Sequence, residues 1–311
     1  MNTLRNLLED YLGVRRALGF KLYNVGLNLQ QFVRFIESES ASVITTELVL
    51  RWATQPPHAH PAYWASRFGM VRGFALYVSA TDPRTEIPPQ GLLPYRYRRK
   101  PPYIYSEEEI TRLIQAAQQL PSTIGLRPHT YSTLFGLLAV TGMRISEPLG
   151  LDRDDVDLTH GALTIRQTKF GKSRWLPIHP STQQALADYA CLRDRLCRKP
   201  KCPGYFISEQ GTRLTQWAAR WTFVRLSHQI GLRGPQDRHG PRLHDLRHRF
   251  AVRTLLTWYR TGVNVEQHLP ELSTYLGHAH VTDTYWYLTA TPELLALAAQ
   301  RLDRTEARGT A

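Results

Sequence analysis

A proline-rich basic segment divides this chain and limits what it can fold into. Six prolines lie between Asp82 and Tyr105, and proline at that density prevents a continuous helix and favours an extended connection. The same segment carries a cluster of basic residues, Arg96, Arg98, Arg99 and Lys100. We therefore expect two folded parts, residues 1–82 and 106–311, joined by a basic linker over residues 83–105.

The residues before the linker show helical periodicity. Apolar residues recur three or four positions apart in four segments, near residues 4–12, 29–36, 48–52 and 64–78. This spacing puts the apolar side chains of each segment on one face of a helix. Four amphipathic segments are enough for a small helical bundle, so we expect an α-helical N-terminal domain.

The residues after the linker are also mainly helical in pattern, with one exception. Ser106 followed by Glu109 predicts a capped helix start. Residues 162–166 and 174–178 lie on either side of a polar turn, which predicts two short strands joined as a hairpin. The expected fold class is mainly α: a helical N-terminal domain, and a mostly α second domain that holds a small antiparallel β-sheet.

The charge of the chain indicates a polyanionic partner. Lys and Arg number 39 against 26 Asp and Glu, which gives a formal net charge of +13. The excess is spread along the chain, because residues 1–100 hold 13 basic and 7 acidic residues, a net charge of +6, and the rest carries +7. A polyanion that touches both parts is the natural partner, and we expect double-stranded DNA.

Composition argues against a membrane protein, a secreted protein and a metal site. The best apolar run, residues 134–140, is too short to cross a bilayer, and the N-terminus lacks the apolar stretch of a secretion signal. We therefore expect a soluble, cytoplasmic protein. The three cysteines, at positions 191, 197 and 202, do not have the spacing of paired zinc knuckles. We expect free thiols, no metal and no cofactor.

Several residues have the chemistry that metal-free cleavage of a phosphodiester requires, which is a nucleophile, cations over the non-bridging oxygens and a proton donor. Arg144 and Arg247 occur in separate motifs, TGMRISE and HDLRH. Guanidinium groups bind phosphate in two places and stay charged. Glu147 lies three residues after Arg144, on the same helical face, where it can steady that guanidinium. His244 lies three residues before Arg247, and histidine as a residue type can exchange a proton near neutral pH.

Two further positions have competing candidates. Lys169 and Lys172 flank the turn of the hairpin, and either can reach a minor-groove edge or a leaving 5′ oxygen. Tyr285 and Tyr287 are two residues apart, so on a helix they point in different directions and only one can meet the phosphate.

The ordered set of motifs resembles the tyrosine recombinase (phage-integrase) family over residues 106–300. By position and helical character, residues 1–82 resemble the family's core-binding domain, which binds DNA. The set comprises TGMRISE, the hairpin lysines, HDLRH, and Leu-Gly-His followed nine residues later by a tyrosine. The resemblance implies that Arg144 and Arg247 clamp the scissile phosphate. It also implies that His244 assists proton transfer from the nucleophile and that His278 donates a hydrogen bond to the phosphate.

The same resemblance decides between the competing candidates. It favours Lys169 over Lys172 as the general acid, and Tyr287 over Tyr285 as the nucleophile. Other basic residues are then expected to contact the DNA backbone: Arg98, Arg99, Lys100, Lys172 and Arg174.

By this resemblance the chain is expected to be a site-specific DNA recombinase, which cleaves a strand through a 3′-phosphotyrosyl bond and rejoins it without ATP. Integration, excision, transposition and resolution all use this chemistry. In the family two protomers bind each site, four form the synapse, and a C-terminal helix such as the one expected from Pro292 often docks on a neighbour. Two alternatives stay open: a type IB topoisomerase-like relaxing enzyme, and a DNA-binding accessory protein with a vestigial site.

Overall fold

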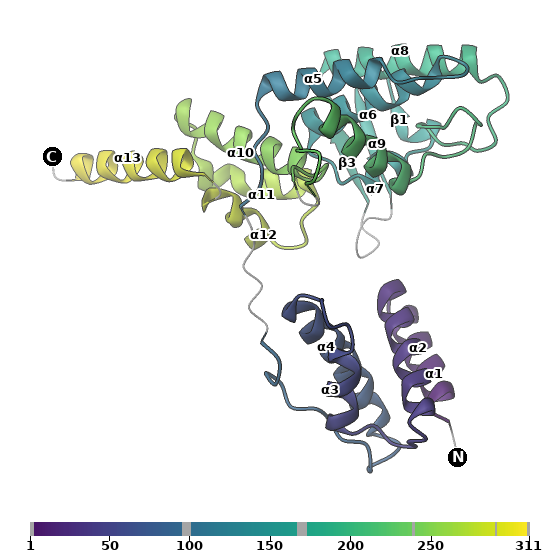
Figure 1. Ribbon diagram of the computed structural model, residues 1–311. Helices are drawn as coiled ribbons and strands as arrows, with labels where there is room; N and C mark the ends of the chain where they lie inside the picture. Colours follow the sequence, from purple (N-terminus) through teal and green to yellow (C-terminus); the bar gives the residue numbers. More distant parts are fainter. Residues whose placement is uncertain (1–2, 95–100, 167–172, 238–239, 290, 310–311) are drawn as a thin grey trace. The chain divides into compact units, whose positions relative to one another are not determined.

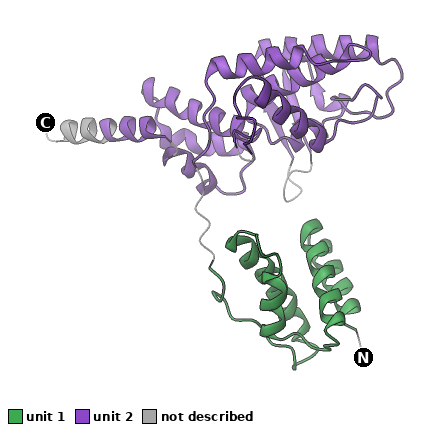
Figure 2. Ribbon diagram, viewed as in Figure 1, with its two compact units in different colours: residues 1–100 green, residues 101–311 purple. Residues whose placement is uncertain are grey.

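The computed structural model describes residues 3–94, 101–166, 173–237, 240–289 and 291–309 (Figure 1), with side-chain surroundings given up to Gln300. The chain divides into two compact units, residues 1–100 and 101–311 (Figure 2), and each is considered by itself. The division falls inside the proline-rich segment. None of the helices in the described ranges is long and apolar enough to cross a membrane.

The first unit is a bundle of four helices, as its periodicity predicts. Two of the helices begin at threonines, Thr3 and Thr45, whose side chains accept a hydrogen bond from the backbone of the first turn, which satisfies a donor that the helix leaves unpaired. The core holds Phe32, Trp52 and Phe74, all essentially buried. The helices are α1 (Leu4–Ala17), α2 (Tyr23–Ser38), α3 (Thr46–Thr54) and α4 (Pro61–Val78).

The second unit is mostly helical. The predicted cap at its start is confirmed, because Ser106 Oγ accepts from the backbone of Glu109 at 3.2 Å and the Glu109 carboxylate accepts from the backbone of Ser106 at 2.8 Å. In the described ranges the 3-10 turns η1 (Arg153–Asp155) and η3 (Trp286–Thr289) interrupt the helices. The helices are α5 (Glu107–Gln118), α6 (Leu126–Thr141), α7 (Ser146–Gly150), α8 (Pro180–Leu196), α9 (Gln216–Gln229), α10 (Asp245–Arg260), α11 (Val265–Leu276), α12 (Thr282–Tyr285) and α13 (Pro292–Gly309).

A small antiparallel sheet completes the second unit and confirms the expected fold class. The predicted hairpin consists of β2 (Ala162–Ile165) and β3 (Arg174–Pro177), which pair so that Leu163 lies opposite Leu176, both fully buried. A third strand, β1 (Val156–Asp157), pairs with β2 on its other side. With two residues it is too short to show a sequence pattern.

The second unit has two apolar cores, and the second of them supports the candidate site. The larger core packs α5, α6, α8 and α9 around residues such as Phe135 and Phe223, whose rings meet at 5.9 Å. The smaller core joins α10, α11, η3 and the start of α13 through residues that include Leu255, Leu276 and Tyr287.

Candidate active site

Arg144 lies in the short link between α6 and α7. The link begins at Gly142, which has a left-handed backbone with φ of +62°. A Cβ at this position would lie 2.7 Å from the ring of Phe250 on α10, so glycine permits both the turn and the close approach of that helix. The guanidinium of Arg144 then donates to the carbonyls of Leu276, at 3.4 Å, and Gly277, at 3.0 Å. Its side chain remains 30% exposed.

Glu147 connects Arg144 to the β-sheet. Its carboxylate accepts from the backbone and from Nη1 of Arg144, at 2.9 and 3.2 Å, and takes two bonds of 3.0 Å from Arg174. Burial raises the pKa of Glu147, but the hydrogen bonds and charges of the two arginines outweigh burial and hold its pKa below the ordinary value. The predicted role of Glu147 in steadying Arg144 is confirmed.

Arg174 does not lie where a backbone contact to DNA is expected. Its side chain is only 11% exposed, and besides the two bonds to Glu147 its Nε donates to the carbonyl of Tyr275 at 3.0 Å. A buried carboxylate needs a buried cation beside it. In this structure Arg174 fulfils that need, and through Glu147 it orders Arg144.

We expect Glu147→Gln to destabilise the second unit by about 3 kcal/mol, the range measured when one partner of a buried ion pair is removed. The amide cannot accept both bonds from Arg174, so a buried guanidinium is left with incomplete pairing. Thermal or urea unfolding measures this effect. Asp157→Asn is the matched control, because Asp157 is exposed and its ion pair with His160 contributes little. Equal stability of the two variants would contradict the role given to Glu147.

Arg247, on α10, lies close to Arg144 although the two residues are far apart in the sequence. It is 2% exposed and donates to the carbonyl of Gly142 at 2.9 Å and to that of Leu276 at 2.8 Å, the second of which Arg144 also approaches. Burial first and the charge of Arg144 second lower the pKa of Arg247 to about 10, so it remains a cation at neutral pH. Two guanidinium groups from distant motifs therefore converge on one backbone oxygen.

Tyr287 lies beside this pair of arginines and Tyr285 does not. Tyr287 is 3% exposed, on η3, and its hydroxyl is hydrogen-bonded with Arg247. Its ring lies parallel to that of His278, with centroids 6.1 Å apart, and tilted against that of His248 at 5.5 Å. Tyr285 is 51% exposed at the end of α12. The structure thus brings the preferred tyrosine to the predicted arginines.

Two of the predicted histidines border the same site. His244 occupies the N-cap of α10 rather than its first turn, and the residue is exposed. His278 is half-buried, and its Nδ1 shares a hydrogen bond of 2.7 Å with the hydroxyl of Thr284. Loss of hydration and then the charge of Arg247 lower the pKa of each histidine to about 4. Both imidazoles are therefore neutral at pH 7.

A third histidine, to which the sequence assigns no role, lies against Tyr287. The ring of His248 is 5.5 Å from that of Tyr287, 5.1 Å from that of Trp286 and 4.8 Å from that of His244. Its Nδ1 is buried and has no hydrogen-bond partner among the described residues. Burial and the neighbouring His244 lower its pKa to about 4. In the sequence, the signal that could have pointed to His248 is its position four residues after His244, on the same helical face.

We expect the protein to lose stability as the pH is lowered from about 6.5 towards 4. In the unfolded chain a histidine has a pKa of about 6.5, while His244, His248 and His278 titrate near 4 when folded. Between these values the unfolded chain binds more protons, so the free energy of unfolding rises with pH in this window and levels off above it. The midpoint of thermal unfolding, recorded against pH, tests this expectation.

His248→Phe is the control for that experiment, because it keeps an aromatic ring against Tyr287 and removes one titrating group. Its unfolding midpoint should depend less steeply on pH than that of the wild type between about 4 and 6.5. Identical slopes would show that His248 does not contribute to the effect.

Some predicted residues lie outside the described ranges. These are Lys169, Lys172, Arg98, Arg99 and Lys100, and their roles stay predictions. Of the three free cysteines, Cys191 is exposed and the other two are half-buried. Within the described residues no group of histidine, cysteine and acidic side chains is arranged to hold a metal ion.

The sequence of this chain is similar to those of known proteins. Residues 104–293 match the sequence profile of the phage integrase family. "Putative integrase/recombinase y4rB" of Sinorhizobium fredii is 50% identical over 308 residues, 98% of each chain. "Tyrosine recombinase XerC" of Herpetosiphon aurantiacus is 27% identical over 285 residues, 89% of this chain and 87% of the relative.

A solved structure has the same fold. It is that of the XerH site-specific recombinase bound to a palindromic difH substrate, in a post-cleavage complex. It is 20% identical and superimposes with a TM-score of 0.66 over 97% of this chain and 85% of the other.

Proposed function

The chain belongs to the phage integrase family and is a tyrosine recombinase, and from this premise we propose how its residues divide the work of breaking and rejoining a DNA strand. The hydroxyl oxygen of Tyr287 attacks the scissile phosphorus, and the bond from phosphorus to the 5′ oxygen breaks. The products are a 3′-phosphotyrosyl bond and a free 5′ hydroxyl. The convergence of Arg144, Arg247 and Tyr287 supports this proposal more than any other observation.

The two arginines supply the charge that the reaction needs. A phenol has a reference pKa of about 10 and is a poor nucleophile at neutral pH. The cation of Arg247, hydrogen-bonded to the Tyr287 hydroxyl, favours the phenolate as it forms. Arg144, with part of its side chain exposed, is open to the incoming phosphate, whose charge increases in the transition state.

The histidines and one lysine handle protons and orient the phosphate. His244 is neutral and partly open to solvent, so it is able to accept the proton of the phenol. His278, fixed through Nδ1 by Thr284, has Nε2 left to donate to a phosphate oxygen. We assign Lys169 as the acid that protonates the leaving 5′ oxygen, with Lys172, Arg98, Arg99 and Lys100 as contacts to the DNA backbone.

With DNA as the substrate, we also propose the location of the protein and the number of protomers in the active complex. We propose that two protomers bind each site in the cytoplasm and that four form the synapse. Leu294 in the first turn of α13 packs into its own unit, and Glu293 pairs with Arg260. The rest of α13 extends beyond these contacts, as Figure 1 shows in yellow. Light scattering of the protein with and without a duplex site tests the stoichiometry.

Trapping on a nicked suicide substrate tests the proposed function. Candidate DNA is incubated with the wild type, covalent complexes are isolated, and the junction nucleotide is sequenced. We expect adducts through a 3′ phosphate at one defined position. Relaxation of plasmids that lack any specific site would instead indicate a topoisomerase-like enzyme, and binding without adducts would indicate an accessory protein.

A further inference from the structure

Thr284 is a fully buried polar residue beside the candidate site. It is 0% exposed, and it lies on α12, three residues before Tyr287. Its hydroxyl oxygen is 2.7 Å from Nδ1 of His278, and this is the only hydrogen bond of its side chain among the described residues. One buried hydroxyl group thus belongs to the segment that carries Tyr287 and is bonded to the ring of His278.

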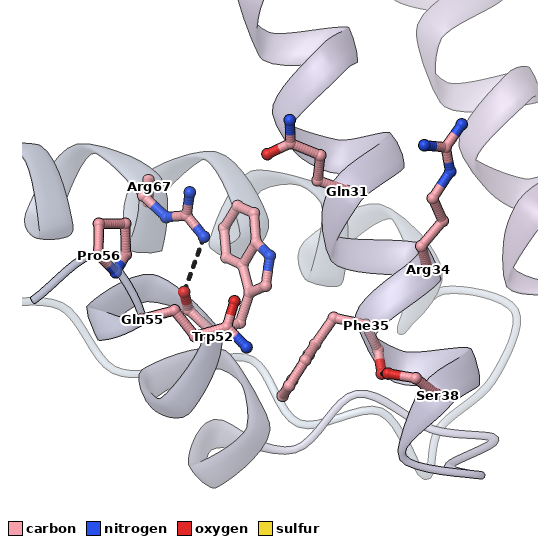
Figure 3. A pocket seen from close by; sticks show the side chains of 8 residues that line it. All are labelled: Gln31, Arg34, Phe35, Ser38, Trp52, Gln55, Pro56 and Arg67. Atoms are coloured by element: carbon pink, nitrogen blue, oxygen red, sulfur yellow. Dashed lines mark hydrogen bonds between the residues drawn. The ribbon is translucent and has the colours of Figure 1, made fainter.

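This hydrogen bond differs from those of other buried or helical polar groups in the protein. The buried cation Arg67, in the first unit, donates to a main-chain carbonyl, that of Trp52, at 2.8 Å (Figure 3). Several threonines in the longer helices donate to the carbonyl four residues earlier, namely Thr54, Thr111, Thr130, Thr254, Thr257 and Thr274. Such bonds to the main chain are the usual way to satisfy a hydroxyl in a helix. Thr284 instead has a titratable ring as its partner.

Burial decides which group of this pair donates. His278, whose pKa is lowered to about 4 mainly by loss of hydration, is neutral at pH 7, so its ring carries one proton, on Nδ1 or on Nε2. If Nδ1 carried the proton, the hydroxyl of Thr284 would accept it, and the hydroxyl proton would be buried without an acceptor, which is unfavourable. With the hydroxyl as donor, Nδ1 accepts and Nε2 carries the ring proton. The geometry therefore selects one tautomer of His278.

The main chain around His278 is fixed by other contacts. The backbone N–H of His278 donates to the carbonyl of Ser273 at 3.0 Å. The preceding Gly277 has a left-handed backbone with φ of +68°, which glycine permits, and its carbonyl accepts from Arg144 at 3.0 Å. The hydrogen bond with Thr284 therefore orients a ring whose main chain is already held in place.

We propose that Thr284 is a positioning residue for strand cleavage: its hydroxyl donates to Nδ1 of His278, which keeps the ring proton on Nε2 and holds the ring in one orientation. The inference rests on the proposed function, in which Nε2 donates to an oxygen of the scissile phosphate. The other tautomer, or a rotated ring, would present a lone pair to that oxygen, and two acceptors repel each other. Because Thr284 and Tyr287 lie on consecutive helical turns, α12 and η3, the segment that brings the nucleophile also orients His278.

Three variants of the full-length protein test this role. Thr284→Val keeps nearly the same shape but lacks the hydroxyl, and Thr284→Ser keeps the hydroxyl. Thr282→Val is the matched control, because it makes the same change at an exposed position of the same short helix. Cleavage of a nicked suicide substrate is measured in a single turnover at saturating protein, and DNA binding is measured by anisotropy.

We expect Thr284→Val to cleave about 10- to 100-fold more slowly than the wild type, the range found when the group that orients a metal-binding histidine is removed. DNA binding should be unchanged, since the hydroxyl is buried and meets only His278. Thr284→Ser and Thr282→Val should cleave at close to the wild-type rate. Cleavage by Thr284→Val at the wild-type rate, or a Thr284→Ser variant as slow as Thr284→Val, overturns the proposal.

NMR of isotopically labelled histidine nitrogens measures the hydrogen bond itself, in the protein without DNA. The chemical shift of a ring nitrogen reports whether it carries a proton and whether it accepts a hydrogen bond, and His278→Gln identifies the signals of this ring. In the wild type we expect Nε2 to be protonated and Nδ1 to have the shift of an acceptor. In Thr284→Val the Nδ1 signal should move to that of a nitrogen without a hydrogen bond. An unchanged Nδ1 signal overturns the proposal.

A double-substitution cycle shows whether Thr284 acts through His278. His278→Ala removes the ring, so Thr284→Val should cause no further loss of cleavage when it is added to His278→Ala. A further loss of the same size as in the wild-type background would show that Thr284 acts on cleavage by another route, and would overturn the proposed role.

The outcomes separate this inference from the proposed function. A wild-type ring with the proton on Nδ1 overturns the inference even if covalent adducts form, and that measurement needs no substitution at Thr284 and no DNA. Absence of adducts in the wild type contradicts the proposed function, and the hydrogen bond then orders the ring of His278 without serving cleavage.

Discussion

Tyr287→Phe should abolish the covalent protein–DNA adduct and leave DNA binding unchanged. The substitution removes one oxygen, which is the proposed nucleophile, and loss of a nucleophile lowers the rate of such reactions by about four orders of magnitude or more. The phenyl ring still fits between His278 and His248, so the smaller core of the second unit should be kept. Adduct formation on a suicide substrate, resolved on a denaturing gel, measures the loss, and anisotropy measures binding.

Tyr285→Phe is the matched control, since it removes the same atom two residues away. Tyr285 is half exposed and lies outside the cluster of arginines. We expect adduct formation close to that of the wild type. An adduct that persists in Tyr287→Phe, or one that disappears in Tyr285→Phe, would reverse the assignment of the nucleophile.

Arg247→Lys should reduce the rate of strand cleavage by about two to three orders of magnitude, the usual effect of removing one preorganised group that stabilises transition-state charge. Lysine keeps the charge but not the planar fork. It therefore cannot bind the carbonyls of Gly142 and Leu276 while it also holds the Tyr287 hydroxyl. Single-turnover cleavage at saturating protein measures the effect, and thermal unfolding records the accompanying loss of stability.

Arg249→Lys separates catalysis from folding in that experiment. Arg249 lies on the same helix, is also buried, and binds Glu107 and the carbonyl of Tyr105, away from the site. We expect it to lower stability and to leave the cleavage rate of the folded protein nearly unchanged. If both variants lose cleavage in proportion to stability, Arg247 acts through the fold alone.

Features that depend on local sequence were predictable. The four helices of the first unit, the capping box at Ser106 and the hairpin of β2 and β3 each follow from spacing within one short segment. A local signal also exists for the link that presents Arg144, because a glycine, Gly142, ends α6 directly before it. These features need no information about the rest of the chain.

Features that depend on packing between distant segments were not predictable from local patterns. Nothing near Arg174 shows that it pairs with Glu147 from another element and is buried there. The ring contact of His248 with Tyr287 depends on how η3 packs against α10. The burial of Tyr287 has the same origin, because its neighbours come from α10, α11 and the segment after it.

The carbonyl of Leu276 has a consequence for how substrate enters. While DNA is absent, this peptide oxygen accepts hydrogen bonds from the guanidinium groups of both Arg144 and Arg247. It thereby takes the place of an oxygen of the phosphate. At this oxygen an arriving anion competes with a neutral acceptor, while Arg144 also keeps its ion pair with the carboxylate of Glu147. Since this acceptor is a main-chain oxygen, no exchange of the side chain at position 276 can delete it, and a shift of the end of α11 is needed to move it away from the two arginines.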